Sequence, residues 1–236
     1  LPDTLAPSYM NPMMTLQGQQ LMASASTMPV DQPAFLQYTS GSTRVPAGVQ
    51  LTNRSILTNV LQIFTAARLR MPLRLVAWLP LHHDMGIILA VFVTILGLPN
   101  EIMAPRDFIQ QPKRWIDQLN RRDSDDGVSI YTVIPNFALE LAARYGKPKD
   151  GETLDLSAID GIIIGSEPVT EKALNSFTEA FGQHGLATNV LRPSYGLAEA
   201  SLLVTTPQTA ERPLISHFNR EKLAEGVVEF VEKGSE

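Results

Sequence analysis

Small hydroxyl side chains gather around a glycine in the segment TSGSTRVPAG, residues 39–48. The hydroxyl donors are Thr39, Ser40, Ser42 and Thr43, on both sides of Gly41. Glycine lets a backbone approach an anion closely, so this composition is typical of a phosphate-binding loop. The segment does not match the Walker pattern, which ends in Gly-Lys followed by Ser or Thr. A surface loop rich in Ser, Thr and Gly explains the same residues, and both interpretations stay open.

Two adjacent histidines and an aspartate form a second polar turn, LPLHHDMG, residues 79–86. Metal ligands must converge on one point, but adjacent side chains point apart, so His82 and His83 do not predict a zinc site. One interpretation is that one histidine faces a cleft and the other lies at the surface. The alternative is a helix start, at which Asp84 caps the helix or favours its N-terminal dipole.

Two further turns follow apolar segments, GSEPV at 165–169 and PSYGLAEA at 193–200. Glu167 fits an acid in the first turn of a helix. Tyr195 could cover a planar ring, and Glu199 could hold a divalent cation, which favours oxygen ligands. A Tyr-Gly turn followed by a glutamate is also ordinary structure, so each motif alone is weak.

The segments between these turns alternate between strand and helix patterns. Strands are expected at 34–39, 74–80, 101–104, 128–135, 161–166 and 187–193, and helices at 53–68 (capped by Thr52 or Asn53), 84–96, 112–121, 136–146 and 169–182. Several of the strands are apolar throughout, which favours an α/β fold with a largely parallel sheet and helices on both faces. Ligands bind such sheets beyond the carboxyl ends of the strands, where these turns lie.

Composition excludes several classes of function. Hydrophobic residues make up 44% and charged residues 18% of the 236 residues, so the chain should fold. The net charge is −5 and no long basic run occurs, which argues against a nucleic-acid partner. The absence of cysteine excludes disulfides, thiol nucleophiles and cysteine zinc sites. The apolar run 85–100 is too short for a membrane span, and the N-terminus does not resemble a signal peptide, so we expect a cytoplasmic protein.

The order of the turns is more specific than any single one and resembles the adenylate-forming superfamily, which includes acyl-CoA ligases, luciferases and peptide-synthetase adenylation domains. The segments YTSGSTRVPAGV, WLPLHHDMG, IPNFALELAARY, GSEPV and PSYGLAEA are most similar to the fatty-acid–AMP ligases. Arg44 and Ala47 stand where the superfamily often has Gly and Lys, and this pair is typical of that branch. The resemblance implies that a fatty acid and ATP form acyl-AMP and pyrophosphate, with Mg²⁺, for transfer to an acyl carrier protein, commonly of a polyketide synthase.

Roles of individual residues follow from the resemblance by matching motif. The resemblance implies that the ATP phosphates contact Thr39, Ser40, Gly41, Ser42 and Thr43. It implies that the adenine lies beside Gly165, Ser166, Glu167 and Pro168, with Tyr195 stacking on the ring and Ser194 and Gly196 forming the floor. It further implies that Glu199 binds Mg²⁺, and that the fatty-acid carboxylate and acyl chain lie near His83, Asn136 and Phe137. Thr43, His83 and Glu199 are the catalytic residues that it implies. His82 stands where relatives mostly have an aromatic residue, and we expect His83 to face the site.

The resemblance also implies a domain organisation. It implies that residues 34–236 are part of the large N-terminal adenylation domain. Residues 1–33 are rich in Pro, Met, Ser and Gln and show no clear period, so their composition predicts a connecting segment with one short helix near 16–25. The C-terminal domain with its adenylation lysine is expected to be absent, so that residues 1–236 alone form little acyl-AMP. Two alternatives stay open, an acyl-CoA ligase of the same superfamily and a nucleotide-binding relative without catalysis.

Overall fold

The computed structural model describes residues 29–39, 47–207 and 211–234. The chain divides into two compact units, residues 1–58 and residues 59–236. The short helix expected near 16–25 lies outside the described residues, as does most of the loop 39–48. The proposed boundary between residues 33 and 34 stays a prediction.

The described part of the first unit is an antiparallel hairpin followed by a helix start. Strand β1 (Pro33–Tyr38) pairs with β2 (Gly48–Thr52), and helix α3 (Asn53–Ala66) follows directly. Oγ1 of Thr52 accepts a hydrogen bond from the N–H of Ser55 at 3.1 Å, which confirms the expected cap. The prediction of a strand-to-helix turn at 39–48 is wrong, because this segment connects the two strands of the hairpin.

A five-stranded parallel sheet forms the centre of the second unit. Its strands lie in the order β4-β3-β5-β6-β7, and each neighbouring pair is parallel. The strands are β3 (Leu73–Ala77), β4 (Asn100–Ile102), β5 (Ser129–Pro135), β6 (Ile159–Gly165) and β7 (Leu191–Pro193). The predicted α/β class with a largely parallel sheet is therefore confirmed.

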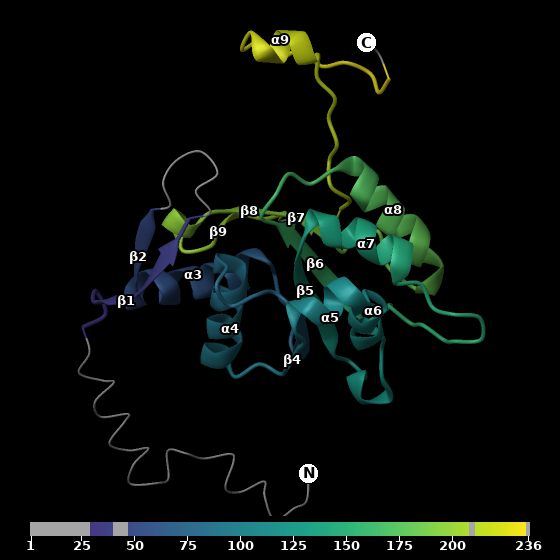
Figure 1. Cartoon of the computed structure of the whole chain (residues 1–236), viewed down its shortest axis with the longest axis horizontal. Coiled ribbons are helices and arrows are strands. Elements are labelled where there is room, and N and C mark those ends of the chain that lie inside the picture. Colours follow the sequence, from purple (N-terminus) through teal and green to yellow (C-terminus); the bar gives the residue numbers. More distant parts are fainter. Residues whose placement is uncertain (1–28, 40–46, 208–210, 235–236) are drawn as a thin grey trace, which may run out of the picture. The chain divides into compact units, whose positions relative to one another are not determined.

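Helices cover both faces of this sheet. Val76, Ile130 and Ile162 belong to the main buried cluster, together with residues of α5 (Pro105–Gln110), α6 (Lys113–Leu119), α7 (Asn136–Tyr145) and α8 (Glu171–Phe181). Helices α7 and α8 pack side by side on this face (Figure 1). Leu75 and Ala77 point to the other face, where they line a small crevice with α4 (Asp84–Leu96). Successive side chains of β3 thus point to opposite faces of the sheet and pack into an apolar layer on each, as expected for a sheet buried on both faces.

Short elements follow the sheet. Strands β8 (Tyr195–Gly196) and β9 (Leu203–Thr205) form an antiparallel hairpin around the 3₁₀ helix η4 (Ala198–Ala200). Near the C-terminus, helix α9 (Arg220–Ala224) lies between Phe218 and Phe230, whose ring centroids are 4.8 Å apart. Two further 3₁₀ turns, η2 (Asp123–Asp125) and η3 (Gly182–His184), complete the regular structure of the described residues. The helices of these residues include none long and apolar enough to cross a membrane.

Candidate active site

The turn 79–86 joins the carboxyl end of β3 to the start of α4, and His83 is the residue that caps this helix. Nδ1 of His83 lies 3.3 Å from the backbone N of Met85 and 2.7 Å from Oδ1 of Asp84. The hydrogen bond with Asp84 raises the pKa of His83 above its ordinary value, against the opposite effect of partial burial. A proton on Nδ1 donates to Asp84, and Nδ1 then no longer accepts the N–H of Met85, which instead donates to Oδ1 of Asp84 at 2.7 Å.

The exposure of the two histidines does not distinguish them. His82 and His83 are both exposed in the described structure, so the expectation that one of them faces a cleft stays a prediction. The alternative interpretation, a helix start, is confirmed in part. The capping residue is His83, and Asp84 is the first-turn acid of α4.

Met85 and Gly165 together connect three of the polar turns. Its Sδ accepts a hydrogen bond from Oγ of Ser166 at 2.6 Å. A Cβ added to Gly165 would lie 3.6 Å from the same sulfur and 3.3 Å from the carbonyl oxygen of Ser194. The turns after β3, β6 and β7 therefore meet at the carboxyl edge of the sheet, where a ligand of a parallel sheet is expected. Ser166 has a φ of 70°, an uncommon left-handed conformation at this junction.

Two reciprocal hydrogen bonds join the turn after β5 to the turn after β6. Oε1 of Glu167 accepts the backbone N–H of Phe137 at 2.7 Å, and Oδ1 of Asn136 accepts that of Thr170 at 3.0 Å. The interpretation of Glu167 as a first-turn acid of its own helix is wrong, because that acid is Glu171. Glu167 instead places a carboxylate at the N-terminus of α7, where a negative charge is stabilising.

Aromatic rings lie beneath this pair of turns. The Trp78 ring, 2% exposed, stacks on Phe108 with centroids 4.0 Å apart and meets the edge of Phe137 at 6.2 Å. The indole N–H of Trp78 is buried and has no hydrogen-bond partner among the described residues. Trp78 is not among the site residues predicted from the sequence. The signal that could have found it is a large aromatic residue directly before a polar turn.

The segment 194–199, which enters the hairpin β8–β9, carries the predicted residues Ser194, Tyr195, Gly196 and Glu199. Tyr195 is 60% exposed, so its ring is accessible, and Glu199 lies in η4 at the surface. A Cβ on Gly196 would lie 2.0 Å from the carbonyl oxygen of Leu202, so only glycine fits here. Oγ of Ser194 donates to the carbonyl oxygen of Arg192 at 3.0 Å and lies 2.8 Å from Oγ1 of Thr206.

Within the first unit, Thr39 is the one described residue among those predicted to contact phosphate. The N–H of Thr39 donates to the carbonyl oxygen of Ala47 at 2.9 Å, and Oγ1 of Thr39 accepts the N–H of Ala47 at 3.1 Å. Thr39 and Ala47 thus pair across the base of the loop. Ser40, Gly41, Ser42, Thr43 and Arg44 lie outside the described residues, and their predicted contacts stay predictions.

A ready-made metal site is absent from the described part of the chain. No group of three or more His, Cys, Asp or Glu side chains there is placed to hold a metal ion. Mg²⁺ commonly uses one or two carboxylates together with substrate phosphates and water. A single exposed carboxylate, Glu199, fits that limited contribution.

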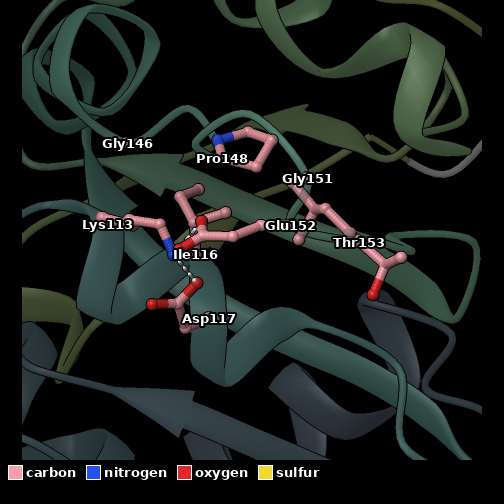
Figure 2. A pocket seen from close by; sticks show the side chains of 9 residues that line it. Lys113, Ile116, Asp117, Gly146, Pro148, Gly151, Glu152 and Thr153 are labelled. Atoms are coloured by element: carbon pink, nitrogen blue, oxygen red, sulfur yellow. Dashed lines mark hydrogen bonds and ion pairs between the residues drawn. The ribbon is translucent and has the colours of Figure 1, made fainter.

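A polar pocket of about 370 Å³ lies away from these turns, between α6 and the loop 146–154. Figure 2 shows Nζ of Lys113 between Asp117, at 2.7 Å, and Glu152, at 3.0 Å. Because α7 starts at the carboxyl edge of the sheet and runs back along it, its C-terminal end near Gly146 lies at the opposite edge. This pocket therefore does not belong to the candidate site.

Known proteins resemble the chain over most of its length. A family model for AMP-binding enzymes matches residues 7–220. The long-chain-fatty-acid–AMP ligase FadD32 of Mycolicibacterium smegmatis is 39% identical over 241 residues, which cover 100% of this chain and 35% of that protein. A Mycobacterium tuberculosis protein with the provisional name fatty-acid–CoA ligase fadD25 is 40% identical over 205 residues, covering 84% of this chain and 34% of that protein.

A solved structure of a known ligase has a similar fold. The fatty acyl-adenylate ligase from L. pneumophila, in complex with acyl adenylate and pyrophosphate, superimposes with a TM-score of 0.76 at 31% sequence identity. The match covers 94% of this chain and 39% of that protein. The chain thus spans between a third and two fifths of the length of these proteins.

Proposed function

Because this chain belongs to the family of AMP-binding enzymes, we propose that the protein containing it activates a long-chain fatty acid with ATP. The observation that carries the proposal is the similarity, along the whole chain, to a protein named as a long-chain-fatty-acid–AMP ligase. A fatty carboxylate oxygen attacks the α-phosphorus of ATP and forms a new P–O bond. The bond from the α-phosphorus to the bridging oxygen breaks, and pyrophosphate leaves with the electron pair.

The carboxyl edge of the sheet is the proposed nucleotide site. Gly165, Ser166 and Pro168 would line the adenine side, Tyr195 would stack on the ring, and Ser194 and Gly196 would shape its floor. The convergence of the three turns around Met85 and Gly165 supports this placement, as does the exposure of the Tyr195 ring. The phosphates would be held by residues 39–43. Oε1 of Glu167 accepts a hydrogen bond from the N–H of Phe137. We therefore propose that Glu167 acts on the adenine side by fixing the turn after β5.

The acyl side is proposed to lie at His83, Asn136 and Phe137. The fatty carboxylate is ionised near neutral pH, so no protein base is needed to activate it. Catalysis then rests on positioning and on donors aimed at the phosphate oxygens. A protonated His83 beside Asp84 would add positive charge near the incoming carboxylate, and the raised pKa of His83 favours that form.

Glu199 is the proposed Mg²⁺ ligand of this chain. The ion, when bound with ATP, would neutralise charge on the phosphates. In the full-length protein, Glu199→Ala should shift the Mg²⁺ dependence of acyl-AMP formation to higher concentration. An unchanged Mg²⁺ dependence would remove Glu199 from this role.

Transfer of the acyl group to an acyl carrier protein, commonly of a polyketide synthase, is the proposed second step. The provisional name of the M. tuberculosis relative favours coenzyme A as a second candidate acceptor. A non-catalytic nucleotide-binding relative is the remaining alternative. The cytoplasmic location also stays a prediction.

One experiment separates these functions. The full-length protein is supplied with ATP, Mg²⁺ and a mixture of fatty acids, alone and with either coenzyme A or an acyl carrier protein, and the products are identified by mass. The proposed function predicts acyl-AMP and pyrophosphate, with thioester formed on a carrier protein but poorly on coenzyme A. Efficient acyl-CoA formation would favour the second candidate. ATP binding without acyl-AMP at any chain length would contradict both ligase functions.

A further inference from the structure

Asn59, in helix α3, holds the hairpin β8–β9 through a pair of hydrogen bonds. Its Nδ2 donates to the carbonyl oxygen of Leu203, and its Oδ1 accepts the N–H of Leu203, both at 3.0 Å. The residue is 3% exposed, so this carboxamide is buried among its partners. Asn59 therefore pairs with Leu203 as a neighbouring strand would pair with it.

The amide orientation is fixed by the partners. The N–H of Leu203 requires an acceptor and its carbonyl oxygen requires a donor, so the oxygen and nitrogen of Asn59 cannot be exchanged. Nδ2 also donates to Oε1 of Gln62 at 3.0 Å. This contact comes from the same helix and is compatible with that orientation, since the amide of Gln62 can present either its oxygen or its nitrogen. A side chain lacking either function would leave a backbone group of Leu203 without its partner.

Leu203 faces the residues of the proposed nucleotide site across the hairpin. It lies opposite Gly196 in the strand register, and Tyr195 lies opposite Thr205. The two strands are connected through η4, which carries Glu199. The strands approach too closely at Gly196 to accept even a Cβ. Fixing the backbone of Leu203 therefore fixes the strand against which Tyr195 and Gly196 are placed.

We propose that Asn59 is a positioning residue for the nucleotide, acting through Leu203 on the hairpin that carries Tyr195 and Glu199. The inference rests on the proposed function, because its kinetic test measures the turnover of ATP and fatty acid. Asn59 itself needs no contact with ATP. Its loss would displace the adenine stack and the Mg²⁺ carboxylate together, so ATP would bind more weakly, because small displacements of positioned groups cost large factors.

The main test uses Asn59→Asp in the full-length protein, with Asn59→Ala as a second variant. The aspartate has nearly the same shape and retains an acceptor for the N–H of Leu203. Its second oxygen faces the Leu203 carbonyl oxygen, which can pair only with a donor. We expect the KM for ATP to rise about 10- to 100-fold, while the KM for the fatty acid stays near that of the wild type.

Thr65→Ala is the matched control, because its exposed hydroxyl bonds only within α3, to the carbonyl oxygen of Leu61 in the described structure. A merely structural role of Asn59 would reduce the amount of folded enzyme and lower kcat without changing either KM. Equal KM values for ATP in the wild type and in Asn59→Asp would overturn the inference. If Asn59→Ala does not fold, Asn59→Asp decides.

Calorimetric titration of ATP into the same variants separates this inference from the proposed function. A wild type that forms no acyl-AMP, but binds ATP at least 10-fold more tightly than Asn59→Asp, would contradict the ligase and support the role of Asn59. Equal ATP affinity in the wild type and the variant would contradict the role of Asn59, whatever the activity.

Discussion

Arg74 provides the sharpest stability prediction, because its guanidinium is buried and binds three parts of the fold. On strand β3, it donates to both carboxylate oxygens of Asp125, through Nε at 3.0 Å and Nη2 at 2.9 Å. Other hydrogen bonds reach Glu101 and the carbonyl oxygens of Gln118 and Asn120. The side chains of Arg74 and Asp125 are 7% and 5% exposed, so neither charge is well hydrated.

Arg74→Met removes the charge and keeps most of the volume. Asp125 would then be a buried carboxylate that keeps the N–H of Arg122, at 3.0 Å, but loses its cation. Removing one partner of a buried ion pair costs about 3–5 kcal/mol. A domain of this size loses about 2–4 °C in melting temperature per kcal/mol, so the expected fall is about 6–20 °C.

Thermal unfolding of the purified 236-residue chain, followed by circular dichroism, measures this fall. Arg54→Met is the matched control, because its ion pair with Asp31 is exposed, and we expect a far smaller change there. In the double variant Arg74→Met, Asp125→Leu, most of the lost stability should return, since no buried charge remains. A fall of less than about 3 °C in Arg74→Met would refute the reasoning that the pair is desolvated.

Three further predictions concern the same fold and site. Burial alone would raise the pKa of Asp125, but its hydrogen bonds, chiefly from Arg74, outweigh this and lower it. Its ion pair with Arg74 therefore stabilises the fold above the ordinary Asp pKa of about 4. The difference in melting temperature between wild type and Arg74→Met should shrink as the pH falls below that value, and a difference that stays constant with pH would contradict this prediction. Gly196→Ala should weaken ATP binding in calorimetric titration, because its Cβ would lie 2.0 Å from the Leu202 carbonyl oxygen, and unchanged affinity would exclude a tight hairpin. Asn136→Leu should reduce the hydrogen-exchange protection of the Thr170 amide about 2- to 12-fold, whereas Asn175→Leu, on the exposed side of α8, should not.

The alternating architecture could be predicted because each of its signals is local. The segment 161–165 within strand β6 is apolar on both faces, and the helix after it begins at a threonine cap that the sequence displays. The position of the polar turns at the carboxyl ends then follows from parallel strand order alone. Strand order thereby locates the turns after β3, β6 and β7, which the structure brings together around Met85 and Gly165.

The small antiparallel hairpins could not be predicted in the same way. Strand β8 has two residues and β9 has three, which is too short for a period of two to emerge. Strand β2 has five residues, but the hydroxyl-rich segment before it resembles a loop that leads directly into a helix, so no strand is predicted there. Both hairpins depend on pairing with a second segment, which a local pattern does not display.

Glu167 illustrates why the contacts within the site were less predictable than its location. An acid at the carboxyl edge of a parallel sheet lies near two helix N-termini. One belongs to the helix that follows its own strand, and the other to the helix that follows the neighbouring strand. The sequence displays only the first, and it therefore suggests a first-turn acid or an adenine contact. The structure selects the second helix, because Phe137 offers a free N–H at 2.7 Å. Asn59 and Asn136 bind backbone groups 144 and 34 residues away in the same manner, so their partners follow from strand order and not from sequence spacing.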